Sequence, residues 1–211
     1  MYPPHVEGSF EGRRRELVAR LKSQGLLTEE TEKAFLAVRR EEFVPESLLD
    51  YAYYDGALEL AEGSTISQPS MIAIMLKELR VQRGMRVLEV GSGSGYLLAL
   101  LSDLGCEAVG IEINPRLAAE SQRTLDREGC EARVIQGDAS TAVVGGGFDR
   151  VVFSAAIAEV PSWAVRFLKP GGFVLAPIGG RNEQELVRAT AEKTERTGRY
   201  CRFVPFILEQ A

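Results

Sequence analysis

Three glycines in five residues, Gly91, Gly93 and Gly95 in VLEVGSGSGYLLALL, have the clearest capacity for binding chemistry in this sequence. None carries a Cβ atom, so their backbone can turn tightly and approach a ligand closely. In open α/β sheets, ligands bind beyond the carboxyl ends of the strands, where such a loop would lie. The spacing favours a ligand-binding loop over a plain turn. Tyr96, however, stands where the dinucleotide fingerprint G-x-G-x-x-G needs its third glycine.

Two acidic residues follow the next two predicted strands and suit a nucleoside. Glu112 stands at the end of the strand predicted over 107–113, where a carboxylate can accept hydrogen bonds from both hydroxyls of a ribose. Asp138 follows the strand predicted over 131–136 and can accept a hydrogen bond from the amine of adenine. An N-cap role is an equally good interpretation of Asp138. S-adenosylmethionine and NAD both contain a ribose, so Glu112 does not choose between them.

Residues that commonly act as a general base or nucleophile are scarce. His5 is the sole histidine and lies close to the N-terminus. Cys106, Cys130 and Cys201 are far apart and form no C-x-x-C pair, which favours reduced thiols packed as small core residues. We therefore expect no metal site, and the chemistry must proceed without an imidazole base.

Alternating strands and helices from residue 86 onward are expected to position these residues. Two further strands are predicted at the end of the chain, in 183–194 and 199–208, flanking a turn near Gly198. This alternation predicts an α/β fold: a doubly wound, mostly parallel, seven-stranded sheet with helices on both faces. The other predicted strands are 86–90, 107–113, 131–136, 148–154 and 173–178, and the predicted helices are 96–104, 115–128 and 161–169.

The first 80 residues read as a helical extension of the same domain. Residues 11–24 and 28–38 are predicted to be amphipathic helices, with Thr28 and Thr31 as competing N-cap candidates for the second. A length of 211 residues fits one domain, so we interpret 1–211 as a single unit whose α/β core is 81–211.

Charge and hydropathy limit the partners. The chain has 30 acidic and 25 basic residues and a net charge of −5, whereas nucleic-acid binders usually carry a basic excess. It contains neither a membrane-length apolar stretch nor a signal-peptide pattern. We expect a cytoplasmic monomer that contacts neither nucleic acid nor membrane.

The order and spacing of the glycine loop, Glu112 and Asp138 resemble the core of class I S-adenosylmethionine-dependent methyltransferases. The segment GSTISQP, just before the glycine-loop strand, resembles the T-I-S-x-P segment of protein-L-isoaspartate O-methyltransferases. VRREEFVPE, FSAAIAEVP, FLKPGG and RFVPF agree with the same family, so the resemblance spans residues 13–206. T-I-S-x-P and A-A-x-x-E-V-P are its most specific parts.

The resemblance implies S-adenosylmethionine as cofactor and the free carboxylate of isoaspartyl residues in damaged proteins and peptides as methyl acceptor. The resulting ester would close to a succinimide and so begin repair. A carboxylate with a pKa of about 4 is already charged at neutral pH, so no base is required to create the nucleophile. The remaining task is to place that carboxylate in line with the sulfonium methyl group.

Ser67 matches the family's active-site serine, and its hydroxyl would orient the carboxylate. The alternative is a purely structural role, in which Ser67 or Gln68 only caps the helix that begins at Pro69. The implied substrate-binding residues are Thr65, Ile66, Ser67, Ala155 and Ala156. The implied cofactor-binding residues are Glu89, Gly91, Ser92, Gly93, Gly95, Glu112, Ile113, Asp138 and Ala139.

Three departures from the family pattern concern the acceptor side. Ser64 stands where relatives commonly have Gln, and Ile157 and Ala158 replace residues of A-A-A-P-E-V-P, which bears on peptide affinity and loop rigidity. Three alternatives stay open. The chain could methylate another acceptor (a modified peptide, a small molecule or RNA), or it could be a catalytically silent cofactor-binding module. A Rossmann dehydrogenase is disfavoured by the glycine spacing and by the absence of a proton-relay histidine.

Overall fold

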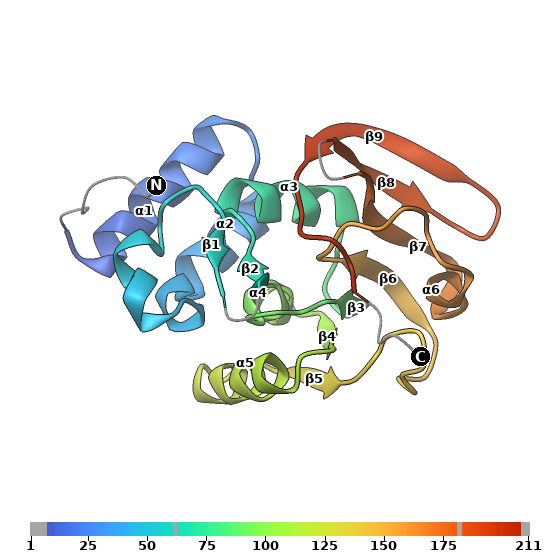
Figure 1. Ribbon diagram of the computed structural model, residues 1–211. Coiled ribbons are helices and arrows are strands. Elements are labelled where there is room, and N and C mark those ends of the chain that lie inside the picture. Colours follow the sequence, from blue (N-terminus) through green and yellow to red (C-terminus); the bar gives the residue numbers. More distant parts are fainter. Residues whose placement is uncertain (1–7, 61–62, 181–182, 208–211) are drawn as a thin grey trace.

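The computed structural model describes residues 8–60, 63–180 and 183–207 and is built around a sheet of seven strands (Figure 1). The strand order across the sheet is β5-β4-β3-β6-β7-β8-β9. Strands β3 to β7 pair in parallel, and β8 and β9 join antiparallel. The predicted doubly wound, mostly parallel α/β fold is therefore confirmed. The strands are β3 (Arg86–Val90), β4 (Glu107–Glu112), β5 (Ala132–Gln136), β6 (Phe148–Phe153), β7 (Leu168–Gly179), β8 (Gln184–Ala189) and β9 (Thr194–Cys201).

The sheet separates two apolar cores because successive residues of a strand point to opposite faces. In β3, Val87 belongs to one core, and Leu88 and Val90 belong to the other. Apolar residues on both faces are expected of parallel strands that are covered on both sides. The helices of this region are α3 (Pro69–Leu79), α4 (Tyr96–Asp103), α5 (Pro115–Arg127) and α6 (Ser162–Arg166).

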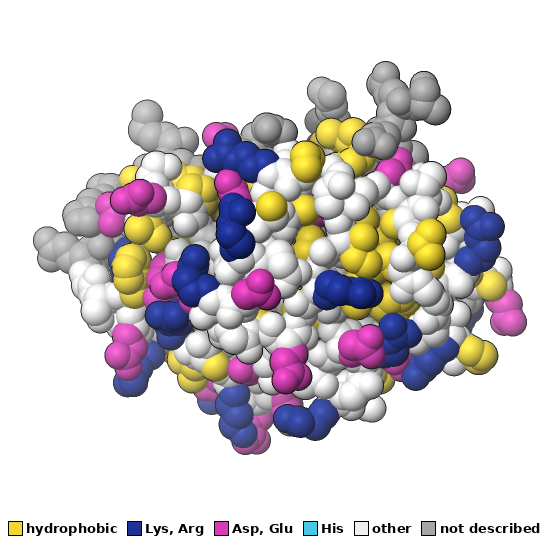
Figure 2. Space-filling model, turned by 90° about the horizontal axis from the view of Figure 1, so that it is seen from below, with side chains coloured by type: hydrophobic (Ala, Val, Ile, Leu, Met, Phe, Trp, Pro, Cys, Tyr) yellow, Lys and Arg dark blue, Asp and Glu magenta, His cyan; other side chains and the backbone are white. Residues whose placement is uncertain are grey.

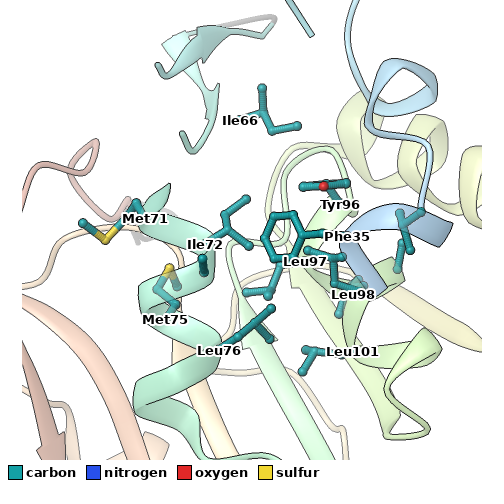
Figure 3. Packing of buried hydrophobic residues seen from close by; sticks show 14 of the residues in the cluster. Phe35, Ile66, Met71, Ile72, Met75, Leu76, Tyr96, Leu97, Leu98 and Leu101 are labelled. Atoms are coloured by element: carbon teal, nitrogen blue, oxygen red, sulfur yellow. The ribbon is translucent and has the colours of Figure 1, made fainter. Parts of the chain in front are cut away.

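Helix α3 is the apolar run that follows T-I-S-x-P, and it lies in the larger core. Ile72, Met75, Leu76 and Leu79 are each at most 2% exposed. Figure 3 shows the side chains of α3 packed beside Leu97 of α4 and Phe35 of the N-terminal region. This packing fixes the segment before α3 relative to the helix that follows the glycine loop.

The N-terminal region is helical, as predicted, and packs against the same core. It contains α1 (Phe10–Ser23), α2 (Glu29–Ala37), two 3₁₀ turns, η1 (Arg40–Phe43) and η2 (Glu46–Tyr51), and a short pair of strands, β1 (Leu58–Glu59) and β2 (Thr65–Ile66). Thr28 is the N-cap of α2 and Thr31 completes a reciprocal capping box, so the two threonines share the role. His5 lies outside the described residues.

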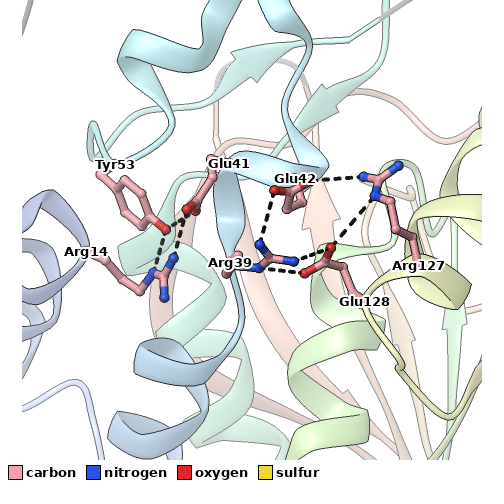
Figure 4. A network of polar contacts seen from close by, with 7 residues as sticks. All are labelled: Arg14, Arg39, Glu41, Glu42, Tyr53, Arg127 and Glu128. Atoms are coloured by element: carbon pink, nitrogen blue, oxygen red, sulfur yellow. Dashed lines mark hydrogen bonds and ion pairs between the residues drawn. The ribbon is translucent and has the colours of Figure 1, made fainter. Parts of the chain in front are cut away.

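Polar contacts fasten η1 to its surroundings on two sides (Figure 4). On one side, Glu41 accepts hydrogen bonds from Arg14 and from the Tyr53 hydroxyl. On the other, Arg39 donates two hydrogen bonds to Glu128, of 2.9 and 2.8 Å. Glu128 directly follows α5, so η1 is tied to the α/β core as well as to α1.

The structure differs from the prediction at the C-terminal hairpin. The turn between β8 and β9 is formed by residues 190–193, where the Thr190 hydroxyl accepts hydrogen bonds from the backbone N–H groups of Glu192 and Lys193. Gly198 lies inside β9, at a shift in register, with φ of +72° and its N–H bonded to Glu185. A glycine of positive φ here forms a bulge rather than a hairpin turn.

Two further segments depart from their predicted state. The helix predicted over 161–169 contains only α6, and β7 begins at Leu168 because Phe148 pairs with Leu168 and its N–H donates to the Phe167 carbonyl. Residues 202–207, predicted as part of a strand, leave the sheet. The backbone of Phe203 bonds to the Gln184 side chain at the start of β8, and Pro205 forms an isolated bridge with Ala156. None of the described helices has the length and apolar character needed to cross a membrane.

Candidate active site

The glycine loop joins β3 to α4 in a conformation that other residues rarely adopt. Gly91, Gly93 and Gly95 have φ angles of +79°, +53° and +82°. At Gly95 a Cβ atom would also lie 3.2 Å from Cβ of Ser121 and 3.3 Å from Cδ1 of Leu125. The backbone therefore requires glycine at these positions, and the loop begins at the carboxyl end of β3.

Glu112 lies directly against this loop. The carboxylate is 6% exposed, and its Oε2 accepts a 2.8 Å hydrogen bond from the Gly93 N–H. The other oxygen, Oε1, accepts a 2.9 Å hydrogen bond from the Asn114 N–H. Each carboxylate oxygen has a second lone pair. The loop thus holds the carboxylate in place and leaves it able to accept two further hydrogen bonds.

Asp138 is buried at the end of β5, with 8% exposure. One carboxylate oxygen accepts hydrogen bonds of 2.7 Å from both the N–H and the hydroxyl of Ser140. Asp138 therefore stabilises a local turn through these two bonds and does not act as the N-cap of a helix. Its neighbours Gly137 and Ala139 line the pocket described below.

Glu89 contributes an unusual buried acid behind the loop. It is 2% exposed, Ser154 donates a 2.5 Å hydrogen bond to Oε1, and Oε2 has no partner among the described residues. Burial raises the pKa of Glu89 to about 8, and the nearby charge of Glu112 adds to this rise while the Ser154 bond opposes it. The hydroxyl of Ser92 is likewise buried without a partner among the described residues.

Buried polar atoms are usually satisfied, so two unsatisfied ones in one place indicate a polar ligand. Glu89 and Ser92 line the same small cavity as Ser67, and this cavity lies between β2, α3 and the glycine loop. The protein thus brings residues predicted for cofactor and for acceptor to one space.

A second, adjoining pocket contains most of the other predicted residues. Gly91, Gly93 and Thr65 line both spaces, so the two are continuous at the loop. The pocket is lined by Ser64, Thr65, Val90, Gly91, Gly93, Ile111, Glu112, Ile113, Gly137, Ala139, Ser154, Ala155, Val204, Pro205, Phe206 and Ile207.

The acceptor-side residues are arranged by the turn before α3. Gln68, not Ser67, occupies the N-cap position of α3, and it makes no side-chain capping bond. The helix start is closed instead by Asp55, whose carboxylate accepts a 2.9 Å hydrogen bond from the Ser70 N–H. The interpretation of Ser67 as a purely structural helix cap is therefore wrong, and no described residue hydrogen-bonds to its hydroxyl.

The remaining predicted acceptor residues differ in how they face the site. Ile66 is 3% exposed and its side chain lies in the core (Figure 3). Ala155 lines the pocket, whereas the backbone of Ala156 is paired with the C-terminal segment. The Ala156 N–H donates to the Val204 carbonyl, and its carbonyl accepts from the Phe206 N–H, both at 2.8 Å.

Other catalytic chemistries find no support in the described part of the chain. No group of three or more His, Cys, Asp or Glu side chains there is arranged to hold a metal ion. Burial raises the pKa of the Cys106 thiol and of the Cys201 thiol to about 11, so both are protonated at neutral pH. A thiol in that state is a poor nucleophile.

Comparison with known proteins decides the family. The family model described as protein-L-isoaspartate(D-aspartate) O-methyltransferase matches residues 12–210. The chain belongs to this family. A protein-L-isoaspartate O-methyltransferase of Methanopyrus kandleri is 38% identical over 95% of this chain and 94% of its own length, and one of Cytophaga hutchinsonii is 34% identical over 96% and 95%.

Solved structures of the isoaspartate methyltransferase family share the whole fold. One from Plasmodium falciparum, described as a complex with S-adenosyl-L-homocysteine, has a TM-score of 0.80 at 25% identity and covers 94% of this chain and 98% of its own. Another protein-L-isoaspartate O-methyltransferase has a TM-score of 0.82 at 30% identity, over 92% of this chain and 65% of its own. The chain is thus an S-adenosylmethionine-dependent methyltransferase of the isoaspartate family.

Several residues at this methyltransferase site were not found from the sequence. Ser154, which donates to Glu89, and the segment 203–207 fall in stretches that match the family pattern, but neither was assigned to the site, because both act through contacts with distant residues. Gly110 does give one, because a glycine inside a strand often marks a close backbone approach. A Cβ atom there would lie 2.7 Å from Cδ1 of Leu98 and 2.8 Å from the side chain of Ser92.

Proposed function

We propose that this protein transfers the methyl group of S-adenosylmethionine to the free carboxylate of L-isoaspartyl residues in damaged proteins and peptides, and that Ser67 orients that carboxylate. One observation carries the assignment of Ser67. Its hydroxyl is not used by the fold and lines the cavity that also contains Glu89 and Ser92. A hydroxyl in this position can donate to an anionic oxygen that enters from the solvent side.

The acceptor explains the lack of a general base near Ser67. The carboxylate of an isoaspartyl residue is ionised at neutral pH and needs no proton removed. A single neutral donor suits it, because an arginine clamp would hold the charge too firmly and weaken the nucleophile. Ser67 and the backbone around it would then hold the acceptor at the correct angle, and orientation of this kind lowers the barrier to reaction.

The residues of the loop fit the cofactor. When bound, S-adenosylmethionine supplies an electrophilic methyl group on a sulfonium. Glu112 would hold the ribose hydroxyls with its two remaining acceptor sites. The unsatisfied atoms of Glu89 and Ser92 would take the polar groups of the methionine part, and Ile113 and Ala139 would flank the adenine.

The chain is also proposed to act as a cytoplasmic monomer, without nucleic acid or membrane as partner. The net charge of −5 supports the absence of nucleic-acid and membrane partners, since phosphate surfaces select for basic proteins. On the face seen in Figure 2, basic and acidic side chains alternate and give no continuous basic area. Gel filtration with light scattering would overturn the monomer if the mass were twice that of one chain.

The experiment that tests the activity uses tritium-labelled S-adenosylmethionine with an isoaspartyl peptide and its normal aspartyl twin. Base-labile label on the isoaspartyl peptide alone is expected, because methyl esters of carboxylates hydrolyse readily. Label on neither peptide, with cofactor still bound, would favour a different acceptor or a silent module. Equal label on both would show that the site does not distinguish the damaged linkage.

A further inference from the structure

Arg40 is the most deeply buried cation of the described residues, and the proposed methyl transfer assigns it no task. Its side chain is 0% exposed at the start of η1. The neighbouring Arg39 points outward and pairs with Glu128, whereas Arg40 donates hydrogen bonds to two backbone carbonyls. Burying a charge without a bonded anionic partner is costly, so the position needs a specific reason.

The two carbonyls belong to different segments of the acceptor side. The Nε of Arg40 donates a 2.8 Å hydrogen bond to the carbonyl of Ala52, just after η2. The Nη2 donates a 3.0 Å hydrogen bond to the carbonyl of Ser67, the residue assigned to orient the methyl acceptor. The guanidinium therefore joins the Ser67 turn to η2.

The same guanidinium also contacts the cofactor side. Its central carbon lies 4.8 Å from the ring centroid of Tyr96. Tyr96 is the first residue of α4, immediately after Gly95 of the glycine loop, and is itself 2% exposed. A cation over an aromatic ring is attracted by it, and burial strengthens the attraction. One rigid group thus touches the turn that holds the acceptor and the helix that follows the donor loop.

The geometry suits arginine and not lysine. A planar guanidinium presents several N–H donors in fixed directions and can bond two carbonyls while its face contacts a ring. A lysine ammonium is a compact point charge on a flexible stem, so it would reach one carbonyl at a time. A purely electrostatic or space-filling role would not require two N–H donors directed at two different carbonyls.

We propose that Arg40 is a positioning residue that sets the distance between the Ser67 turn and the glycine loop, and so aligns methyl acceptor with methyl donor. This inference rests on the proposed function of Ser67. Arg40 acts through the backbone of Ser67 and contacts neither substrate nor cofactor. Since a misplacement of about 1 Å can lower a rate roughly a hundredfold, loss of these two hydrogen bonds should reduce turnover much more than ligand binding.

The test compares Arg40→Lys with the matched control Arg39→Gln. Arg39→Gln removes the pair of hydrogen bonds to Glu128 from the neighbouring residue without touching the Ser67 turn. We expect Arg40→Lys to lower kcat on an isoaspartyl peptide about tenfold or more, with a cofactor Kd within about threefold of wild type. Arg39→Gln should keep kcat within about twofold of wild type.

Hydrogen exchange provides a readout that does not depend on the acceptor assignment. Amides of the segment 64–68 should exchange faster in Arg40→Lys than in wild type, while those of β4 and α5 stay unchanged. If wild-type protein methylates no isoaspartyl peptide, the proposed function fails, but this exchange comparison still tests the role of Arg40.

Four outcomes would overturn the proposal. The first is a folded Arg40→Lys protein with kcat within about twofold of wild type. The second is an equal loss of kcat in Arg39→Gln, and the third is exchange that rises throughout the N-terminal region. The last is failure of both Arg40→Lys and Arg40→Gln to fold, because the residue would then serve the fold as a whole.

Discussion

Asp55 accepts a hydrogen bond of 2.9 Å from the backbone N–H of Ser70 and thereby closes the start of helix α3. Ser67 lies two residues before Pro69, the first residue of that helix, and no described residue hydrogen-bonds to its hydroxyl. A residue from another segment, Asp55, therefore caps the helix. This leaves the Ser67 hydroxyl available for the methyl acceptor.

Replacing Asp55 with alanine should destabilise the protein. The Ser70 N–H would lose its partner, and loss of an N-cap costs about 1 kcal/mol, within a range of roughly 0.5 to 2 kcal/mol. Urea unfolding followed by circular dichroism measures the change. Asp126→Ala is the control, because the Asp126 carboxylate accepts an exposed hydrogen bond from Gln122, which lies on the same helix. Equal effects of the two substitutions would contradict the capping role.

Ser67→Ala should lower turnover and leave cofactor affinity nearly unchanged. Losing one hydroxyl donor to the acceptor costs about 1 kcal/mol, or roughly fivefold in rate. The measurements are steady-state kinetics on an isoaspartyl peptide and calorimetric titration with the cofactor. A large loss of cofactor binding would contradict the assignment of Ser67 to the methyl acceptor.

Glu112→Ala should weaken cofactor binding about tenfold to a hundredfold. The substitution removes charge-assisted hydrogen bonds to the ribose and also frees the Gly93 N–H. Glu107→Ala, at the exposed start of the same strand, should leave the cofactor Kd unchanged. An unaltered Kd in Glu112→Ala would refute the ribose assignment.

Cofactor affinity should rise with pH because of Glu89. Burial raises its folded-state pKa from 4.5 to about 8, so the apo protein holds the neutral acid at neutral pH. Its contribution to stability is therefore full below about pH 4.5 and is lost as the pH rises through about 8. A cationic cofactor favours the ionised carboxylate, so binding should strengthen over the same interval.

The variant Glu89→Gln separates this effect from the titration of the cofactor itself. Calorimetric Kd values between about pH 6 and pH 9 should change less in Glu89→Gln than in wild type. Without cofactor, the melting temperature of Glu89→Gln minus that of wild type should increase as the pH rises. Parallel pH profiles for the two proteins would disprove the role of Glu89.

Gly110→Ala should displace the glycine loop, because Gly110 lies in β4 against Ser92 of the loop. The added Cβ would lie 2.7 Å from Leu98 and 2.8 Å from Ser92, so the loop or α4 must shift. Overpacking of this kind costs about 1–3 kcal/mol, and a weaker cofactor Kd should accompany it. Gly180→Ala is the control, because a Cβ added there would meet nothing within 4 Å. A normal Kd in Gly110→Ala would show that the loop adapts.

Local patterns were sufficient to predict the sheet and the loop. The strand predicted over 86–90 has the same bounds as β3, and the acids Glu112 and Asp138 stand where each following strand ends. These features depend on neighbouring residues, so the sequence displays them. The C-terminal hairpin was misplaced because a glycine near a predicted strand end suits a turn and a bulge equally well.

Contacts between distant segments account for what the sequence did not reveal. The bonds from Arg40 to the Ser67 carbonyl and from Ser70 to Asp55 join residues 27 and 15 positions apart. In both pairs, the residues that flank each partner in the sequence do not indicate the contact. The burial that raises the pKa of Glu89 likewise depends on the assembled core, so no neighbouring residue signals its altered protonation.

The pairing of Ala156 with Val204 and Phe206 bears on which proteins this enzyme can repair. Both main-chain groups of Ala156 are already engaged, so a client polypeptide gains no sheet-like pairing at that position. Any contact that a client makes at Ala156 must therefore come through side chains or bridging water rather than through shared backbone hydrogen bonds.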